Sequence, residues 1–283
     1  MTIAEAQREG AAFLAGPLGE AARSEADYLL CAILGVERLD LFRHSDRLLN
    51  RRELAHFKGA LARRARRIPL AYITGRREFF GLTFRVAGVL IPRPESESLV
   101  EFARNSTLTS PAVLDLCCGS GCLGIAFAYS QQVSLLHLAD IDSRALQTAA
   151  ENARTMLSAT DFSCFQSDGF KNIRLEYDLI FCNPPYVSIA QYARLEPELH
   201  YEPVHALIKT HPEDFAAGLL LDGLQHLKGG GMMLLEATES IISNLLTRIR
   251  HKNAVFEPGF DAAGQIRFIV MQKKAMADVK STS

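Results

Sequence analysis

The run Asn183-Pro184-Pro185-Tyr186 directly follows the apolar stretch "DLIFC" and is rich in hydrogen-bond acceptors. Proline lacks a backbone N–H and has a fixed φ angle, so this segment offers rigidly placed carbonyl groups without competing donors. Asn183 adds a side-chain carbonyl, and Tyr186 adds an aromatic face. The loop therefore suits a planar NH2 group, which needs two acceptors for its hydrogens and a flat surface beside it.

A glycine loop lies closer to the N-terminus, after the strand predicted at "AVLDLCC". Gly119-x-Gly121-x-x-Gly124 satisfies the dinucleotide-binding pattern, and Asp140 follows at the distance expected of a carboxylate that binds ribose hydroxyls. Asp115 precedes the glycines, where a carboxylate repels a pyrophosphate but attracts an ammonium or sulfonium group. We therefore predict S-adenosylmethionine as the cofactor.

Two further residues follow predicted strands of the same region. Asp168 comes after the third strand and is a candidate partner for the adenine amino group, although a helix cap would serve equally well there. Asn183 ends the fourth strand and therefore lies at the same edge of the sheet. We expect it to contact both the cofactor and the substrate.

These groups together could make a poor nucleophile reactive. The lone pair of an amide or aromatic amine is delocalised into the π system, as it is in the peptide bond. Two acceptors that hold both hydrogens out of that plane favour a pyramidal nitrogen, whose lone pair points at a methyl group. Orientation and electrostatic stabilisation of the developing positive charge both lower the barrier. We predict direct methyl transfer without a covalent enzyme intermediate or a metal, with Asn183, Pro184 and Tyr186 as the catalytic residues.

The residues that precede this region form two different patterns. Residues 1–77 place apolar residues three and four apart, which predicts a small helical domain. Residues 78–91 alternate in polarity from Phe80 to Val86, with Ala87-Gly88 as a plausible turn, which predicts a β-hairpin linker. Pro94 then begins a helix.

Strands and helices alternate over residues 92–283. The alternation runs from "AVLDLCC" to "GMMLLEA", with a turn expected at Gly229–Gly231, and "AVFEPGFDAAGQIRFIVMQK" fits a final pair of strands. Such a pattern predicts an α/β fold with a mostly parallel sheet covered by helices on both faces. Ligands of these sheets bind beyond the carboxyl ends of the strands, where the strand order reverses.

Composition and charge exclude several classes of protein. The formal net charge of −1 over 283 residues excludes a generally basic nucleic-acid coat, and the apolar runs are too short to span a bilayer. The beginning "MTIAEAQREG" lacks the apolar core of a signal peptide, so a cytoplasmic location is expected. The six cysteines lack zinc-ligand spacing, which favours buried free thiols and no metal site. The low charge and two compact domains are compatible with a monomer.

The helix predicted around residues 51–67 carries a concentration of positive charge. Its basic residues are Arg51, Arg52, Lys58, Arg63, Arg64, Arg66 and Arg67. A solvated helix face and a docking surface for an acidic or RNA-associated partner are both compatible with this pattern.

The motifs taken together resemble a known family. "DLCCGSGCLG", Ala139-Asp140 and "NPPY" resemble class I S-adenosylmethionine-dependent methyltransferases that act on exocyclic or amide nitrogens. More specifically, "FFGLTFRVAGVLIPRPESESLVE" and "YEPVHAL" resemble the release factor glutamine methyltransferases, the HemK/PrmC family. The resemblance implies a Rossmann-like domain with a mostly parallel seven-stranded sheet, preceded by a helical domain that recognises the substrate. It also implies methylation of the side-chain nitrogen (N5) of the glutamine in the Gly-Gly-Gln motif of class I peptide-chain release factors.

The resemblance assigns roles to individual residues of this chain. Asn183 and the carbonyl of Pro184 would hold the glutamine amide, and Tyr186 would pack on it. The implied substrate-binding residues are Phe80, Pro92, Arg93, Pro94, Asn183, Pro184, Pro185 and Tyr186. The implied cofactor-binding residues are Asp115, Gly119, Gly121, Asp140, Asp168 and Asn183. Glu97 matches an acidic position of the family, although a surface role for it also remains open.

The sequence departs from the family pattern at two places. Cys117-Cys118 and Cys122 stand where the family usually has small residues, and "IKTHPEDFAAG" replaces a Gly-rich stretch after "YEPVHAL". The first change is compatible in size. The second affects the loop beside the substrate but none of the residues implied in methyl transfer.

Three other functions are compatible with parts of the sequence. Adenine N6 methyltransferases also use Asn-Pro-Pro-Tyr, but they need a basic groove or a target-recognition domain to extract the base and grip phosphates. We therefore expect no direct nucleic-acid substrate, although the basic helix favours one. A non-catalytic scaffold on the translation apparatus would fail to bind S-adenosylmethionine. A nicotinamide oxidoreductase would be protected by a nicotinamide cofactor and not by S-adenosylmethionine.

Overall fold

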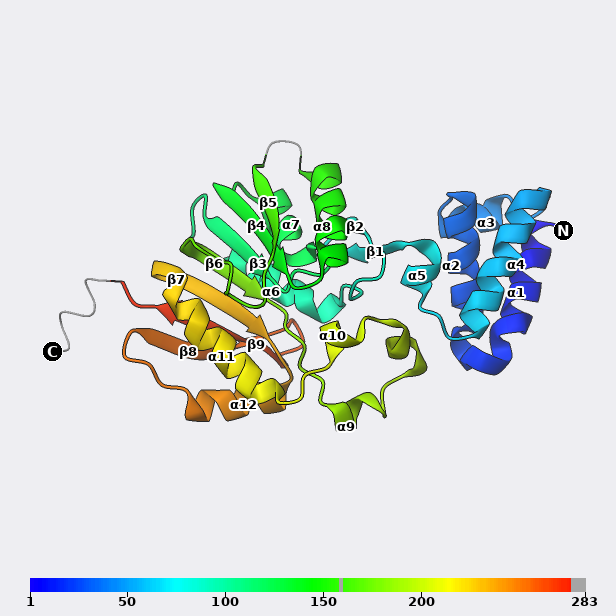
Figure 1. Cartoon of the computed structure of the whole chain (residues 1–283). Helices are drawn as coiled ribbons and strands as arrows, with labels where there is room; N and C mark the ends of the chain where they lie inside the picture. Colours follow the sequence, from blue (N-terminus) through cyan, green and yellow to red (C-terminus); the bar gives the residue numbers. More distant parts are fainter. Residues whose placement is uncertain (158–159, 276–283) are drawn as a thin grey trace. The chain divides into compact units, whose positions relative to one another are not determined.

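The computed structural model describes residues 1–157 and 160–275, and the chain divides into two compact units (Figure 1). The first unit contains Met1–Arg76 and Glu196–Tyr201, and the second contains Arg77–Leu195 and the residues from Glu202 onward. No helix in the described part of the chain is both long and apolar enough to cross a membrane.

The first unit is helical, which confirms the prediction of a helical N-terminal region. Its helices are α1 (Ile3–Leu18), α2 (Ala22–Leu34), α3 (Arg38–Arg43), α4 (Arg51–Ala65) and α5 (Leu70–Thr74), with the 3-10 helices η1 (Gly19–Ala21) and η3 (Pro197–Tyr201). Capping boxes begin α1 at Thr2 and α4 at Asn50, where side chain and backbone exchange hydrogen bonds. Leu14, Leu30 and Phe57 lie in the core between the helices.

Glu196–Tyr201 belongs to this unit although it is distant in sequence from the other helices. Arg64 of α4 is only 5% exposed, and its guanidinium pairs with Glu25 of α2 and with Glu198, the latter at 2.8 Å. Arg67 contacts the same Glu198 carboxylate at 2.8 Å. Two of the basic residues predicted to be solvated or to bind a partner therefore hold this segment instead.

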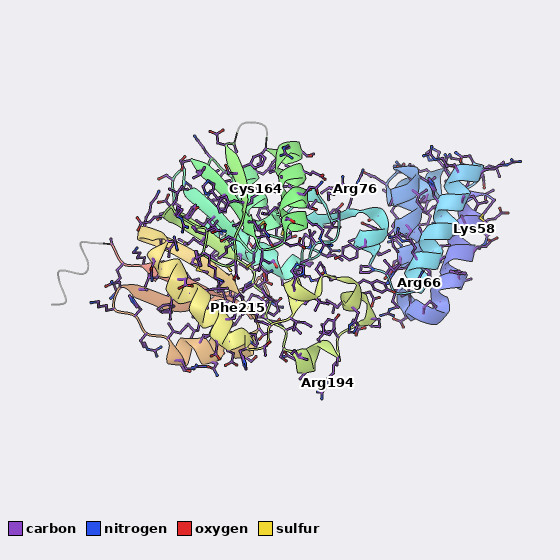
Figure 2. The ribbon with its side chains drawn as sticks, viewed as in Figure 1. Lys58, Arg66, Arg76, Cys164, Arg194 and Phe215 are labelled. Carbon is purple, nitrogen blue, oxygen red and sulfur yellow. The ribbon has the colours of Figure 1, made fainter. Side chains whose placement is uncertain are left out.

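The other basic residues of the 51–67 region are exposed. They are Arg51, Arg52, Lys58, Arg63 and Arg66, and Lys58 and Arg66 can be followed in Figure 2. The bond of Arg63 to the Tyr72 carbonyl at 3.0 Å leaves its side chain on the surface. The exposed face of α4 therefore stays basic.

Replacing Arg64 by methionine is expected to destabilise the first unit by about 3 kcal/mol, because it leaves the Glu25 and Glu198 carboxylates without their shared partner. Urea unfolding measures this loss, and limited proteolysis near residues 196–201 should become faster. The exposed Arg52→Met variant is the matched control. Equal unfolding midpoints for the two variants would show that the Arg64 ion pairs contribute nothing.

The second unit is an α/β structure. Its strands are β1 (Arg76–Phe79, beginning at the unit boundary), β2 (Leu82–Arg85), β3 (Ala112–Leu116), β4 (Leu135–Asp140), β5 (Phe162–Gln166), β6 (Tyr177–Cys182), β7 (Leu227–Glu236), β8 (Ala254–Phe260) and β9 (Ile266–Lys273). Its helices are η2 (Pro94–Ser96), α6 (Glu97–Arg104), α7 (Cys122–Ser130), α8 (Ser143–Met156), α9 (Ile189–Tyr192), α10 (Val204–Leu207), α11 (Pro212–Gln225) and α12 (Glu239–Arg248).

Seven strands form one sheet in the order β5-β4-β3-β6-β7-β9-β8. Neighbours from β5 to β7 are parallel, and β9 runs antiparallel to both β7 and β8. The predicted mostly parallel seven-stranded sheet is thereby confirmed. The chain winds outward in opposite directions from β3 and β6, so the carboxyl ends of these two strands mark the switch point where ligands bind in such sheets.

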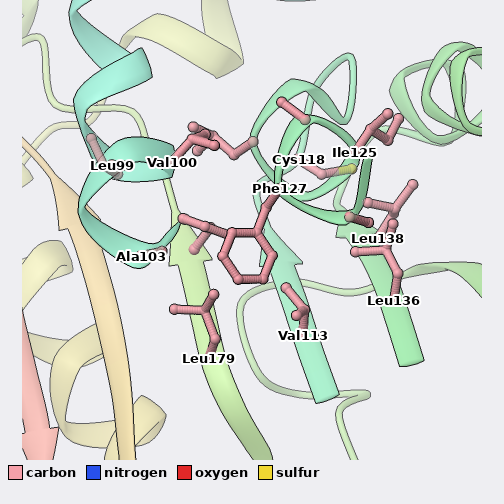
Figure 3. Close-up of a cluster of buried hydrophobic side chains, with 14 of the residues drawn as sticks. Leu99, Val100, Ala103, Val113, Cys118, Ile125, Phe127, Leu136, Leu138 and Leu179 are labelled. Atoms are coloured by element: carbon pink, nitrogen blue, oxygen red, sulfur yellow. The ribbon is translucent and has the colours of Figure 1, made fainter. Parts of the chain in front are cut away.

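Helices cover both faces of the sheet. Successive side chains of a strand point to opposite faces, so each face has apolar residues for helices to bury. On one face Val113, Leu136 and Leu179 pack with residues of α6, α7 and α8, and Phe127 of α7 is at the centre of this cluster (Figure 3). On the other face the intervening strand residues pack with α11 and α12. The central strands β3 and β6 are buried from both sides, which explains their mostly apolar sequences.

Two local predictions were wrong. The hairpin exists, but its turn lies at Phe80-Gly81 and not at Ala87-Gly88. Both Phe80 (φ 51°) and Gly81 (φ 73°) have positive φ, which a tight two-residue hairpin turn of type I′ requires. Gly229–Gly231 lies inside β7, where the pairing with β6 shifts register, so it forms a bulge and not a turn before the strand.

Candidate active site

A pocket of about 230 Å³ opens beyond the carboxyl ends of β3, β4 and β6. The predicted site residues that line it are Pro92, Arg93, Asp115, Gly119, Asp140, Asp168, Asn183 and Pro185. The predicted site residues outside its lining are Phe80, Pro94, Gly121, Pro184 and Tyr186. The sheet thus brings the glycine loop, the two strand-end carboxylates and Asn183 to a single cavity.

Asp115 ends in a buried carboxyl group with one oxygen available to a ligand. Its Oδ2 accepts a hydrogen bond from the Gly124 backbone at 2.9 Å, while Oδ1 is buried without a hydrogen-bond partner among the described residues. A Cβ atom at position 124 would lie 2.9 Å from the Cβ of Asp115, so glycine permits this close approach. Burial raises the pKa of Asp115 to about 8, and the nearby Asp140 adds to the effect. A cation at Oδ1 would satisfy this group.

Binding of S-adenosylmethionine is therefore expected to release a proton at pH 7. Without a ligand, the Asp115 carboxyl is mostly protonated below a pKa of about 8, and a cationic ligand favours its ionised form. The dissociation constant should fall as pH rises from 6 towards 8. Calorimetry at pH 7 in two buffers of different ionisation enthalpy measures the released proton.

The Asp115→Asn variant is the control for this linkage, because it cannot release a proton from that position. Its binding heat should not depend on the buffer. A wild-type binding heat that is equally independent of the buffer would contradict a cation bound at Asp115.

Asp140 is held rigidly at the end of β4. Its Oδ2 accepts from the Gly119 backbone and its Oδ1 from the Asp142 backbone, both at 2.9 Å. Burial raises its pKa although these two hydrogen bonds oppose the shift. The carboxylate thus fixes the glycine loop, and its remaining acceptor positions suit hydroxyl groups such as those of a ribose. Gly121 (φ 78°) is the N-cap of α7.

Asp168 lines the pocket, but its carboxylate forms an ion pair with Lys171 and is half exposed. Close by, Lys209 lies 3.8 Å from the centroid of the Phe215 ring, and both side chains line the pocket. Phe215 is near the start of α11 (Figure 2). The atypical "IKTHPEDFAAG" stretch therefore supplies part of the wall beside Asp168.

The Asn-Pro-Pro-Tyr loop is anchored at several points. Asn183 follows β6 and is partly exposed to the pocket, whereas Pro184 is buried. The hydroxyl of Tyr186 donates to Oε1 of Glu236 at 3.3 Å. The Val187 backbone donates to the Leu207 carbonyl at the end of α10 and accepts from the Lys209 backbone, both at 2.9 Å. The loop is thus anchored just after its two prolines, through Tyr186 and Val187.

A buried glutamate holds the "IPRP" segment. Glu202 is 4% exposed, and its two oxygens accept from the Ile91 backbone at 2.9 Å and from Nη2 of Arg93 at 2.5 Å. Pro92 and Arg93 therefore have a fixed position at the pocket wall. The "YEPVHAL" motif contains Glu202, but its contact with this segment is visible only in the structure.

Phe80 and Pro94 lie outside the lining of the pocket. The Phe80 backbone donates to Oε1 of Glu97 at 2.9 Å, and Arg104 lies 5.6 Å from the centroid of its ring. Pro94 occupies the start of η2. Glu97 therefore ties the hairpin turn to α6, which is a structural role for this acidic position.

The cysteines of the glycine loop are free thiols. Cys117, Cys118 and Cys122 all line the pocket, and burial raises the pKa of Cys118 and Cys122 well above its usual range. Neutral thiols of this kind are inert. No group of three or more possible metal ligands occurs among the residues that the structure describes.

Comparison with known proteins assigns the chain to a family. Residues 5–75 match the family model "PrmC N-terminal domain", and residues 95–195 match "Methyltransferase small domain". A solved structure, "Crystal structure of Methyltransferase from Pyrococcus furiosus", has a TM-score of 0.50 and 16% identity over 80% of this chain and 99% of that chain. At this identity the likeness shows the fold alone.

The curated relatives are more specific. The chain is 34% identical to "Release factor glutamine methyltransferase" of Leptospira interrogans over 89% of this chain and 91% of that protein. It is 33% identical to the protein of the same name from Nitratidesulfovibrio vulgaris, over 91% and 90% of the two chains. A protein of that name from Rhodopirellula baltica is 32% identical over 90% of each chain. The chain belongs to the release factor glutamine methyltransferase family.

Proposed function

We propose that this enzyme transfers a methyl group from S-adenosylmethionine to the side-chain nitrogen (N5) of the glutamine in the Gly-Gly-Gln motif of class I peptide-chain release factors. The observation that carries the proposal is the position of Asn183 in one pocket with the Asp115 and Asp140 carboxylates. The relatives from Leptospira interrogans and Nitratidesulfovibrio vulgaris are named for release factor glutamine, which supports the same substrate.

The pocket residues suit the cofactor. Asp140 would accept hydrogen bonds from the ribose, the free oxygen of Asp115 would receive a positive charge, and the wall near Asp168 and Phe215 would hold the adenine. When bound, S-adenosylmethionine supplies an electrophilic methyl group on a sulfonium centre. The buried carboxylates favour this positively charged ligand over a nucleotide pyrophosphate.

The chain's own contribution to the reaction is orientation. Oδ1 of Asn183 and the carbonyl of Pro184 would accept the two N–H groups of the glutamine amide and so direct its lone pair towards the methyl group. These acceptors would also stabilise the positive charge that develops on nitrogen while the N–CH3 bond forms and the S–CH3 bond breaks, before the nitrogen loses one proton to solvent. Tyr186 would support the loop and, with Pro185, Phe80 and the segment Pro92–Pro94, shape the substrate side.

A protein substrate fits this site better than a nucleic acid. Arg93, a cation of the pocket wall, is already paired with the buried Glu202, and the net charge of the chain is −1. A duplex would need several unpaired cations for its phosphates. We propose that the enzyme acts in the cytoplasm as a monomer, with residues 1–77 recognising the release factor, 78–91 as the linker and 92–283 as the catalytic domain.

An assay with labelled S-adenosylmethionine and three acceptors tests the proposal. The acceptors are a release factor, the same factor with its Gly-Gly-Gln glutamine replaced by alanine, and duplex DNA. Label is expected on the intact release factor only. Label on DNA would move the function to an adenine methyltransferase and overturn the proposal.

A further inference from the structure

Glu236 is a buried residue that belongs to none of the family motifs and does not line the pocket. It is the last residue of β7 and is 6% exposed, directly after the fully buried Leu234 and Leu235. In the parallel pairing of β6 with β7, Cys182 lies opposite Leu235, so the next residues along each strand, Asn183 and Glu236, are neighbours. Burial of a carboxylate is costly unless hydrogen bonds compensate it.

Within the part of the chain that the structure describes, Glu236 has one bonded and one unpartnered carboxylate oxygen, and its bonded partner belongs to the Asn-Pro-Pro-Tyr loop. Tyr186 donates its hydroxyl to Oε1 at 3.3 Å. Its Oε2 atom is buried without a hydrogen-bond partner among the described residues. Burial raises the pKa of Glu236, whereas the nearby polar side chains of Ser96, Tyr186 and Asn183 lower it. Tyr186 and Asn183, two of these three neighbours, are members of the Asn-Pro-Pro-Tyr loop, so the unpartnered Oε2 atom is available to accept from the Asn183 NH2 group.

The chemistry of the two side chains determines their orientation. An ionised carboxylate only accepts hydrogen bonds, and the asparagine side chain has one donor end and one acceptor end. An Asn183 amide that bonds to Glu236 must turn its NH2 group towards the carboxylate. Its Oδ1 atom then points away from Glu236, and Asn183 lines the pocket.

We propose that Glu236 is a positioning residue: it binds the NH2 group of Asn183 and the hydroxyl of Tyr186, and so presents the Asn183 carbonyl oxygen to the substrate amide. This inference rests on the proposed function and adds to it. The two prolines fix the backbone of the loop, but only a group beyond the loop can select between the two orientations of the Asn183 amide. A catalytic loop without this carboxylate would present a donor to the substrate amide for part of the time.

The Glu236→Gln variant tests the inference, because glutamine has the same shape but can donate to Oδ1 of Asn183 and turn it from the substrate. We expect kcat to fall roughly 10- to 100-fold, as for other small displacements of positioning groups. The KM for the release factor and the affinity for S-adenosylhomocysteine should change little. Glu239→Gln, on the exposed first turn of α12, is the matched control and should behave as wild type.

A double-mutant cycle separates positioning of Asn183 from a general structural role. If Glu236 acts through Asn183, the Glu236→Gln change should cost less than about threefold in kcat in an Asn183→Ala background. Equal costs in both backgrounds, or a wild-type kcat for Glu236→Gln, would overturn the inference. An inactive wild-type enzyme on release factors would instead refute the proposed function, so the two failures are distinguishable.

A measurement on the wild-type protein keeps the test independent of variant folding. The side-chain NH2 signals of Asn183, identified by their absence in Asn183→Ala, can be followed by NMR in the S-adenosylhomocysteine complex. Donation to a buried carboxylate predicts slow exchange of one of these hydrogens with solvent. Exchange as fast as that of the exposed Asn105 side chain would contradict the inference.

Discussion

Replacing Asn183 by alanine is expected to lower kcat for methyl transfer by roughly 10²- to 10³-fold, the usual effect of removing one preorganised group that stabilises transition-state charge. In the proposed mechanism the side-chain carbonyl of Asn183 is one of two acceptors for the substrate amide, and the Pro184 carbonyl is the other. Cofactor affinity should remain close to that of the wild type, because the buried carboxylates of Asp115 and Asp140 are unchanged. Single-turnover kinetics with saturating S-adenosylmethionine measure the chemical step.

The matched control for this variant is Asn105→Ala, at the exposed C-terminal end of α6. It should keep the wild-type rate. A full rate for Asn183→Ala would show that the loop does not activate the amide, whatever the substrate is.

The second large effect is expected for Asp140→Ala, which should weaken S-adenosylmethionine binding roughly 10²-fold. Two hydrogen bonds from ribose hydroxyls to a charged group are worth about 3 kcal/mol together, which corresponds to that factor. The change also frees the Gly119 backbone, which Asp140 holds at 2.9 Å. Calorimetry with S-adenosylmethionine or S-adenosylhomocysteine measures the dissociation constant.

At saturating cofactor the Asp140→Ala enzyme should recover much of its kcat, since Asn183 and Pro184 remain in place. The exposed Asp46→Ala variant controls for loss of a negative charge alone. Unchanged cofactor affinity in Asp140→Ala would place the nucleoside elsewhere and contradict our account of the pocket.

Much of the catalytic fold could be predicted because its signals are local. The central strands are mostly apolar runs bounded by polar residues, and the parallel arrangement from β5 to β7 brings the carboxyl ends of these strands to one edge. Asp115, Asp140 and Asn183 meet in one pocket for this reason. The chemical roles of these three residues could therefore be predicted from residue type and position in the sequence alone.

The long-range contacts could not be predicted, because no local pattern encodes them. Glu202 binds the Ile91 backbone across 111 residues of sequence, and Glu198 joins the helical unit through Arg64. For Glu236 a signal existed: an acidic residue ends the buried run "MMLL", as Asp140 ends its own strand. The hairpin turn was misplaced because Phe80 is an uncommon residue at positive φ, whereas Ala87-Gly88 looked like an ordinary turn.

The direction of the Tyr186 side chain could not be predicted from its residue type. The aromatic ring was expected to face the substrate, but its hydroxyl bonds to Glu236 and the residue does not line the pocket. The sequence of a loop tells which side chains it carries, but the direction of each side chain depends on its contacts with the neighbouring strand, here β7. Contact between Tyr186 and a bound glutamine remains a prediction.

The most direct test of the central claim is to locate the transferred methyl group on the acceptor atom. A release factor is incubated with the wild-type enzyme and S-adenosylmethionine, digested, and its Gly-Gly-Gln peptide is fragmented by tandem mass spectrometry. The account predicts one added methyl group on the glutamine side chain, retained as methylamine when the amide is hydrolysed. A methyl group on any other residue, or release of methanol on hydrolysis, would contradict transfer to an amide nitrogen held by the Asn183 loop.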